Sequence, residues 1–347
     1  MTRKTRDIKL FIGVIAMMRK RRLALASLAS FAILLTLGGC GSLNLEPANV
    51  TLNGYTIDQD TGTVNFNLSA FDYNDELITS GTVSQASVVV TRATDAAGNP
   101  LSNVSAEAQV CGDITSHEAI VAVITLDATG SMADNDPTDQ RNDAAKSFID
   151  RLGPGDLAAV ASFDTDTAPS AGFYAIHVWQ DFTDDKESLY AAVDQATFAG
   201  GGTNLWDAVV DDVNLLATST SDAEKVALVL TDGEDTDSFY TAVDAASYAK
   251  DHGAKVYMIG LGDPNTLDFS EMQYVASETG GLFAAASDPD QLSNMFDGMF
   301  NASKASFCIA ARFSVNGAPP APGTTISGIL SFAVNGSSFD VDFTVTF

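Results

Sequence analysis

The chain has 347 residues, of which 46% are hydrophobic and 18% are charged. This hydrophobic content excludes an intrinsically disordered chain, because disordered segments bury too little apolar surface to fold. The 45 acidic residues outnumber the 18 basic ones and give a formal net charge of -27. A nucleic-acid partner is therefore not expected, since binding phosphates requires clustered Lys and Arg. Excess acid also favours solubility in a salty medium.

Residues 18–40, MRKRRLALASLASFAILLTLGGC, have the layout of a signal peptide. Basic residues come first, about 15 mostly apolar residues follow, and small residues precede a cysteine. The apolar run is shorter than the ~20 residues that a transmembrane helix needs. We therefore expect residues 1–39 to be a lipoprotein signal peptide, with translation starting at Met1, Met17 or Met18.

The end of this segment, LGGC, resembles the lipobox of bacterial lipoproteins. In such proteins the cysteine carries the lipid, palmitate included, and becomes the first residue of the mature chain, which makes Cys40 the candidate lipidation site. The resemblance implies a lipid-anchored protein of the bacterial cell envelope. Gly41 and Ser42 after the cysteine favour the outer membrane or the cell surface. The alternative is a plain secretory signal with an incidental cysteine.

Short alternating runs such as TVNFNLSAF (63–71) occupy the chain up to residue 110 and predict antiparallel strands joined by turns. The same pattern returns after residue 306, where about 40 residues are few for an independent domain. We expect residues 40–112 and 306–347 to form one β-sandwich, into which residues 113–305 are inserted. The alternative is two separate small β modules.

Two cysteines besides Cys40 lie close to the ends of the central region, at Cys111 and Cys308. Disulfides persist outside the cytoplasm, so we expect these two to be bridged. The alternative is a pair of free buried thiols.

In the central region, apolar strands alternate with amphipathic helices. The strand candidates are EAIVAVITLD, DLAAVASFD, YAIHVWQDF, KVALVLTDG, KVYMIGLGD and GLFAAAS. The helix candidates are QRNDAAKSFIDRL, KESLYAAVDQA, LWDAVVDDVNLLA, YTAVDAASYAKDH and DPDQLSNMFDGMF. Such alternation predicts a doubly wound α/β fold, with a mainly parallel sheet and helices on both faces.

The segment LDATGSM (126–132) follows the first central strand and places Asp127, Thr129 and Ser131 two residues apart. Side chains at that spacing point the same way in extended backbone. Thr203 in a Gly-rich loop and Asp232 after another apolar strand could reach the same edge of the sheet, where α/β proteins bind ligands. A set of carboxylate and hydroxyl oxygens suits Mg2+ or another hard divalent cation.

These five residues resemble the metal-ion-dependent adhesion site of the von Willebrand factor type A domain, found in integrins and many bacterial surface proteins. That site is written D-x-S-x-S, then a distant T and a distant D, and here Thr129 replaces the first serine. The resemblance covers residues 117–303 and implies direct coordination by Thr129 and Ser131. It implies that Asp127 and Asp232 act largely through water, and that Thr203 binds in the ligand-engaged form. An acidic side chain of a partner protein would complete the coordination, and Mn2+ or Ca2+ could replace Mg2+.

The function expected from this resemblance is metal-dependent protein binding at the cell surface, not enzymatic catalysis. The alternatives are a metal-dependent hydrolase and a scaffold component of an envelope complex. The hydrolase has little support, because His117, His177 and His252 stand in no motif and Ser131 has no evident base partner. The acid-rich loops at 164–170 and 232–238 do not have EF-hand spacing and are interpreted as solvated loops.

Overall fold

The computed structural model describes residues 46–262 and 267–347. The predicted signal peptide and Cys40 lie outside the described residues, so those predictions stay untested. The described residues form one compact unit. Within the described part of the chain, every helix is too short or too polar to cross a bilayer.

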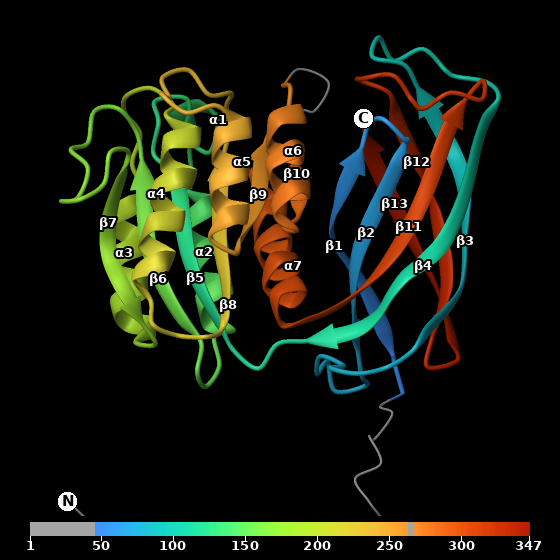
Figure 1. The fold of residues 1–347 in the computed structure, drawn as a ribbon, viewed down its shortest axis with the longest axis horizontal. Helices are drawn as coiled ribbons and strands as arrows, with labels where there is room; N and C mark the ends of the chain where they lie inside the picture. The colour runs from blue at the N-terminus through green and yellow to red at the C-terminus, as the bar shows by residue number, and fades with distance from the viewer. Residues whose placement is uncertain (1–45, 263–266) are drawn as a thin grey trace, which may run out of the picture. The chain divides into compact units, whose positions relative to one another are not determined.

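The central region contains six strands of a ten-stranded sheet, in the order β10-β9-β8-β5-β6-β7 (Figure 1). Their bounds are β5 (Ile120–Asp127), β6 (Leu157–Phe163), β7 (Ile176–Thr183), β8 (Glu224–Thr231), β9 (Ala254–Leu261) and β10 (Phe283–Ala286). All neighbours pair in parallel except β7, which is antiparallel to β6 at the edge. Every residue of β5 is buried, as expected for a central strand covered on both faces.

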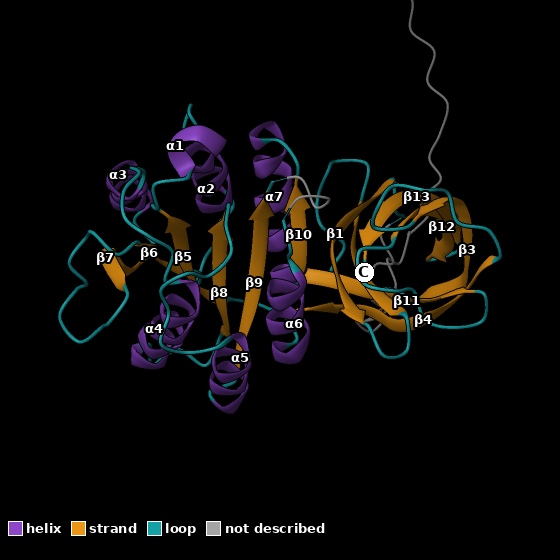
Figure 2. Ribbon diagram, turned by 90° about the horizontal axis from the view of Figure 1, so that it is seen from above, coloured by secondary structure: helices purple, strands orange, loops and turns teal. Residues whose placement is uncertain are grey.

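Helices cover both faces of this sheet (Figure 2). Their bounds are α1 (Met132–Asn135), α2 (Gln140–Asp150), α3 (Lys186–Ala196), α4 (Leu205–Thr218), α5 (Ala242–Asp251), α6 (Ser270–Thr279), the 3-10 turn η1 (Pro289–Gln291) and α7 (Leu292–Lys304). Helices α2, α3 and α7 pack on one face, and α4, α5 and α6 pack on the other. The predicted doubly wound α/β class is confirmed.

The remaining strands come from the two ends of the described chain. They are β1 (Asn49–Asp58), β2 (Thr63–Phe71), β3 (Val83–Thr94), β4 (Val104–Ser116), β11 (Ala305–Val315), β12 (Thr325–Val334) and β13 (Ser337–Thr346). Strand β11 pairs with both β2 and β4, and β12 pairs with β3, so the two ends of the chain share sheets. Cys111 on β4 and Cys308 on β11 form a disulfide, with Cα atoms 5.0 Å apart.

The ten-stranded sheet also joins the two parts of the fold, which the sequence did not indicate. Strand β1 pairs with β10 through the single register pair Tyr55↔Phe283, and the full order is β4-β11-β2-β1-β10-β9-β8-β5-β6-β7. The close approach depends on Gly54, because a Cβ there would lie 2.9 Å from the carbonyl oxygen of Phe283. The β-rich part therefore continues the edge of the α/β sheet.

Candidate metal-binding site

Asp127 is the last residue of β5 and is fully buried. Its Oδ1 accepts a hydrogen bond from the backbone N–H of Thr129 at 2.8 Å. Its Oδ2 accepts one from the hydroxyl of Thr231, the last residue of β8, at 2.6 Å. Both carboxylate oxygens are therefore oriented at the carboxyl edge of the sheet, where β5 and β8 end side by side.

Asp232 follows β8 directly and is 2% exposed. Its Oδ1 accepts from the Ser131 hydroxyl at 2.7 Å, and its Oδ2 accepts from Nδ2 of Asn135 at 2.9 Å. The hydroxyl oxygens of Thr129 and Ser131 lie 3.2 Å apart. Two segments separated by about a hundred residues thus place carboxylate and hydroxyl oxygens in direct contact.

The loop that carries Thr203 is joined to the same place by its backbone. Gly200 N–H donates to Ala128 at 2.8 Å, and Gly130 N–H donates to Gly201 at 3.1 Å. Gly201 has a φ of +69°, and a Cβ there would lie 2.7 Å from the backbone nitrogen of Asp166, so a side chain would push this loop away.

Thr203 is 6% exposed and is fixed by the segment that follows Asp232. Its carbonyl oxygen accepts from the backbone N–H groups of Thr236 at 2.9 Å and Asp237 at 3.0 Å. Its hydroxyl oxygen faces Gly233, whose Cβ position is 3.9 Å away. Side-chain contacts therefore connect four of the predicted residues. The fifth, Thr203, lies beside Gly233, the residue that follows Asp232.

Two carboxylates meet here without a basic partner. Burial, and then the charge of Asp232, raise the pKa of Asp127 to about 6. Neither carboxylate belongs to an ion pair among residues 46–262 and 267–347. Oxygen-only donors with uncompensated negative charge fit a hard divalent cation.

The donor set relies on hydroxyls as much as on carboxylates. In the described part of the chain, no cluster of three or more His, Cys, Asp or Glu side chains is arranged to hold a metal ion. Thr129 is 1% exposed whereas Ser131 is exposed, so Ser131 is the member of the set that faces solvent.

Two residues of the site were not predicted from the sequence. Thr231 orients Asp127, and Asn135 orients Asp232. Thr231 directly precedes Asp232, and a polar residue at the end of an apolar strand was a usable signal. Asn135 lies four residues after Ser131, and only the single turn of α1 brings it back to the site.

The histidines lie elsewhere. His117 pairs with Glu224 at 2.6 Å, and Nδ1 of His252 lies 2.8 Å from the carbonyl oxygen of Tyr248. Nδ1 of His177 lies 2.9 Å from the carbonyl oxygen of Ala168. None of these contacts involves one of the five candidate residues.

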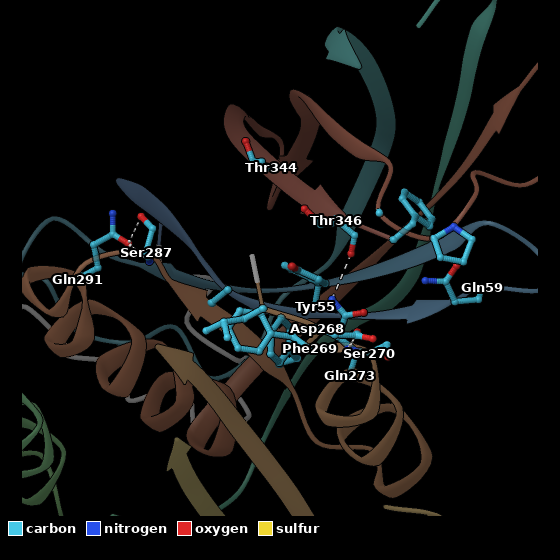
Figure 3. Close-up of a pocket in the computed structure, with 16 residues that line it drawn as sticks. Tyr55, Gln59, Asp268, Phe269, Ser270, Gln273, Ser287, Gln291, Thr344 and Thr346 are labelled. Atoms are coloured by element: carbon cyan, nitrogen blue, oxygen red, sulfur yellow. Dashed lines mark hydrogen bonds between the residues drawn. The ribbon is translucent and has the colours of Figure 1, made fainter. Parts of the chain in front are cut away.

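A separate cavity of about 810 Å³ lies where β1, β10, α6 and the end of β13 meet (Figure 3). Gln273 Nε2 donates across it to the carbonyl oxygen of Thr346 at 3.1 Å. Burial raises the pKa of the Tyr55 phenol well above its usual range. The lining mixes aromatic rings, amides and hydroxyls and contains none of the five candidate residues.

The sequence profile of the von Willebrand factor type A domain matches residues 122–298, slightly more than half of the chain. The chain belongs to the von Willebrand factor type A family. The matched range begins within β5, ends within α7 and contains all five candidate residues. A comparison with curated proteins finds no match.

Several solved structures resemble the chain. Proximal thread matrix protein 1 from the mussel byssus is 22% identical over 59% of this chain and 51% of its own, with a TM-score of 0.46. A second structure of that protein has a zinc-occupied MIDAS motif, with 22% identity, 59% and 50% coverage and a TM-score of 0.45. BatB from Bacteroides thetaiotaomicron is 18% identical over 53% of this chain and 98% of its own, with a TM-score of 0.43. The chain spans about half the length of the mussel protein.

Proposed function

We propose that this chain is a lipid-anchored protein of the bacterial cell envelope whose von Willebrand factor type A domain binds a protein ligand through a divalent cation. The observation that supports this best is the meeting of oxygen side chains from three distant segments at one edge of the sheet. The proposed metal-binding residues are Asp127, Thr129, Ser131, Thr203 and Asp232. The proposed ion is Mg2+, with Mn2+ and Ca2+ as alternatives.

Four of the five residues have proposed roles that their contacts support. Thr129 and Ser131 present hydroxyl oxygens as direct ligands, and Ser131 does so on the solvent side. Asp127 and Asp232 supply negative charge and are held in place by Thr231 and Asn135. When bound, the cation supplies a positive charge with an open coordination position, which an acidic side chain of the partner can fill.

The rest of the chain would present this site to its partner. We propose that residues 113–305 are the ligand-binding domain and that residues 40–112 and 306–347 support it above the membrane. Cys40 would carry the lipid. The disulfide between Cys111 and Cys308 ties the supporting strands together close to both junctions.

The contacts of the described residues do not support the hydrolase alternative. A metal-dependent hydrolase needs a base or acid that can move a proton near the activated water. The three histidines are engaged elsewhere, and the hydroxyl of Ser131 donates to a carboxylate that a cation would also attract.

The proposal can be tested by metal-dependent copurification. Native membranes containing the full-length protein or its Asp127→Ala variant are solubilised with detergent in Mg2+, without crosslinking, and washed on affinity resin in Mg2+. We expect EDTA to release one stoichiometric protein from the wild-type resin and not from the variant resin. An EDTA-insensitive partner, or turnover of a substrate with no partner, would contradict the proposal. Cys40→Ser should also abolish palmitate labelling and membrane retention.

A further inference from the structure

Several exposed apolar side chains lie in segments that contact α4, the helix that follows Thr203. Seven large apolar side chains are exposed among residues 46–262 and 267–347, and four of them are Tyr174, Phe239, Tyr240 and Val243. Phe239 is 87% exposed and Tyr174 is 83% exposed. Phe239 and Tyr240 belong to the segment that begins at Asp232. Large exposed aromatic side chains are typical anchors of protein interfaces.

These aromatic residues are held in place by carboxylates of α4, which begins two residues after Thr203. The two oxygens of Asp207 accept from the backbone N–H of Phe239 at 2.9 and 3.0 Å, and Oδ1 also accepts from that of Tyr240 at 2.8 Å.

One turn further along α4, Oδ2 of Asp211 accepts from the backbone N–H groups of Tyr174 and Ala175, each at 2.7 Å. Asp211 is 1% exposed, so this anchor is buried beneath the loop it holds. The backbone at these aromatic residues is thus held by the helix next to the site, which lowers the entropy lost when a partner binds.

Charge is unevenly distributed between the two edges of the parallel sheet. The loops around the candidate site carry five exposed acids, at Asp134, Asp139, Asp166, Glu234 and Asp237. The one base in these loops and the first turn of α2 is Arg141, which is 1% exposed and paired with Asp136 and Asp139.

Basic side chains lie at the opposite edge instead. Lys225 and Lys255 lie at the starts of β8 and β9, and Lys304 is the last residue of α7. A partner that offers only a carboxylate would therefore be attracted by the ion and repelled by the surrounding acids. A basic residue next to that carboxylate offsets the repulsion from the surrounding acids.

We infer that the partner segment carries a Lys or Arg beside its metal-binding carboxylate, with the stem of that basic side chain packed on Phe239 and its charge facing the acidic loops. This inference rests on the proposed function and names the chemistry of its partner. A cation over an aromatic face gains electrostatic attraction, and the aliphatic stem covers apolar surface. Phe239 and Tyr240, whose ring centroids lie 5.5 Å apart, are called the aromatic platform below.

The inference can be tested by selection from a library of random 12-residue peptides displayed on phage. The full chain is immobilised in detergent with Mg2+, and bound phage are released with EDTA. We expect the released peptides to combine one Asp or Glu with an excess of Lys or Arg at neighbouring positions. Their binding to Phe239→Ser should be weaker by about tenfold, as is typical when an aromatic anchor is lost.

Matched variants distinguish the contribution of the aromatic platform to peptide binding from general effects of surface substitutions. Tyr73→Ser removes another aromatic side chain, 74% exposed and in the turn after β2, and should leave peptide binding unchanged. The double change Asp134→Asn with Glu234→Gln should weaken binding and flatten its salt dependence. The double change Asp340→Asn with Asp342→Asn on β13, which also removes two exposed acids, is the matched control.

Each outcome has a defined consequence. EDTA-released peptides with an acid but no excess of bases would overturn this inference and leave the proposed function standing. Equal binding to Phe239→Ser and Tyr73→Ser would also overturn it. Failure to release any peptide with EDTA, together with no difference between wild type and Asp127→Ala, would contradict the proposed function itself and therefore this inference.

Discussion

Two groups of buried carboxylates, one at each edge of the parallel sheet, have different partners. At the amino edge, Asp156 is fully buried, and its Oδ1 lies 2.9 Å from Nζ of Lys304 and 2.9 Å from the backbone nitrogen of Ile120. At the same edge, Glu224 pairs with both Lys255 and His117. Buried negative charge is therefore matched by a protein cation there.

At the carboxyl edge, Asp127 and Asp232 are equally buried but receive only hydroxyl, amide and backbone donors. Hydrogen bonds compensate part of the desolvation cost of a carboxylate, and two like charges add repulsion. The comparison teaches that burial alone does not distinguish a structural acid from a binding acid. The absence of a protein cation is not sufficient either, since Asp211 and Asp212 on α4 are buried without one in the described chain. Asp127 and Asp232 differ from them in lying at the edge of the sheet beside the exposed hydroxyl residue Ser131.

The largest expected effect comes from removing the cation at the amino edge. Lys304→Met leaves Asp156 buried and unpaired, and should lower the free energy of unfolding by about 3 to 4 kcal/mol. Urea denaturation at pH 7 measures this directly. Lys250→Met is the matched control, because the Lys250–Glu278 pair is largely exposed and should contribute below about 0.5 kcal/mol. Equal losses in the two variants would contradict the proposed difference between the edges.

A change of opposite sign is expected at the carboxyl edge. Because the pKa of Asp127 is raised to about 6 in the folded protein, the unfolded chain ionises first as pH rises. Stability of the EDTA-treated protein should therefore fall between about pH 4 and pH 6, as the linkage relation requires. Asp127→Asn removes this fall and should raise the free energy of unfolding at pH 7 by about 3 kcal/mol.

The matched variant for that prediction is Asp156→Asn, which should destabilise the protein at the same pH because Lys304 loses its partner. Melting curves across pH 4 to pH 8 with EDTA present compare the two. Added Mg2+ should raise the melting temperature of the wild type and leave that of Asp127→Asn unchanged. Destabilisation by both Asn variants would show that Asp127 is a structural acid like Asp156.

The smallest change in unfolding free energy is expected when a residue that only orients a proposed metal-binding side chain is replaced. Asn135→Ala removes one hydrogen bond to Asp232 and should cost about 0.5 to 1 kcal/mol of unfolding free energy with EDTA present. Loss of an orienting partner typically lowers metal affinity by about tenfold or more. Calorimetric titration of Mg2+ measures the affinity. An affinity unchanged within error would remove Asn135 from the site.

The sequence predicted best those features that depend on periodicity and strand ends. The apolar runs before Asp127 and Asp232 indicated buried parallel strands, and parallel strands bring their carboxyl ends to one edge. Helix α6 was missed because its buried positions include Gln273, which interrupts the apolar stripe and instead binds Thr346. The contacts of Asn135 depend on a one-turn helix that periodicity cannot show.

The junction of the two parts of the fold was also beyond the sequence. Its strand pairing consists of one register pair, Tyr55↔Phe283, and requires that Gly54 has no side chain. Helices α6 and α7 also pack on β1. Neither the register pair nor Gly54 produces a pattern that extends over several residues, and predictions from sequence rely on such patterns.

The central claim is that the unpaired acids at the carboxyl edge are held for a divalent cation. Isothermal titration of Mg2+, Mn2+ and Ca2+ into the wild-type protein and Asp127→Ala tests it most directly. We predict that at least one of the three ions binds a single saturable site per chain in the wild type. We predict that none of them binds a saturable site in the variant. Identical titration curves for the two proteins would contradict the account.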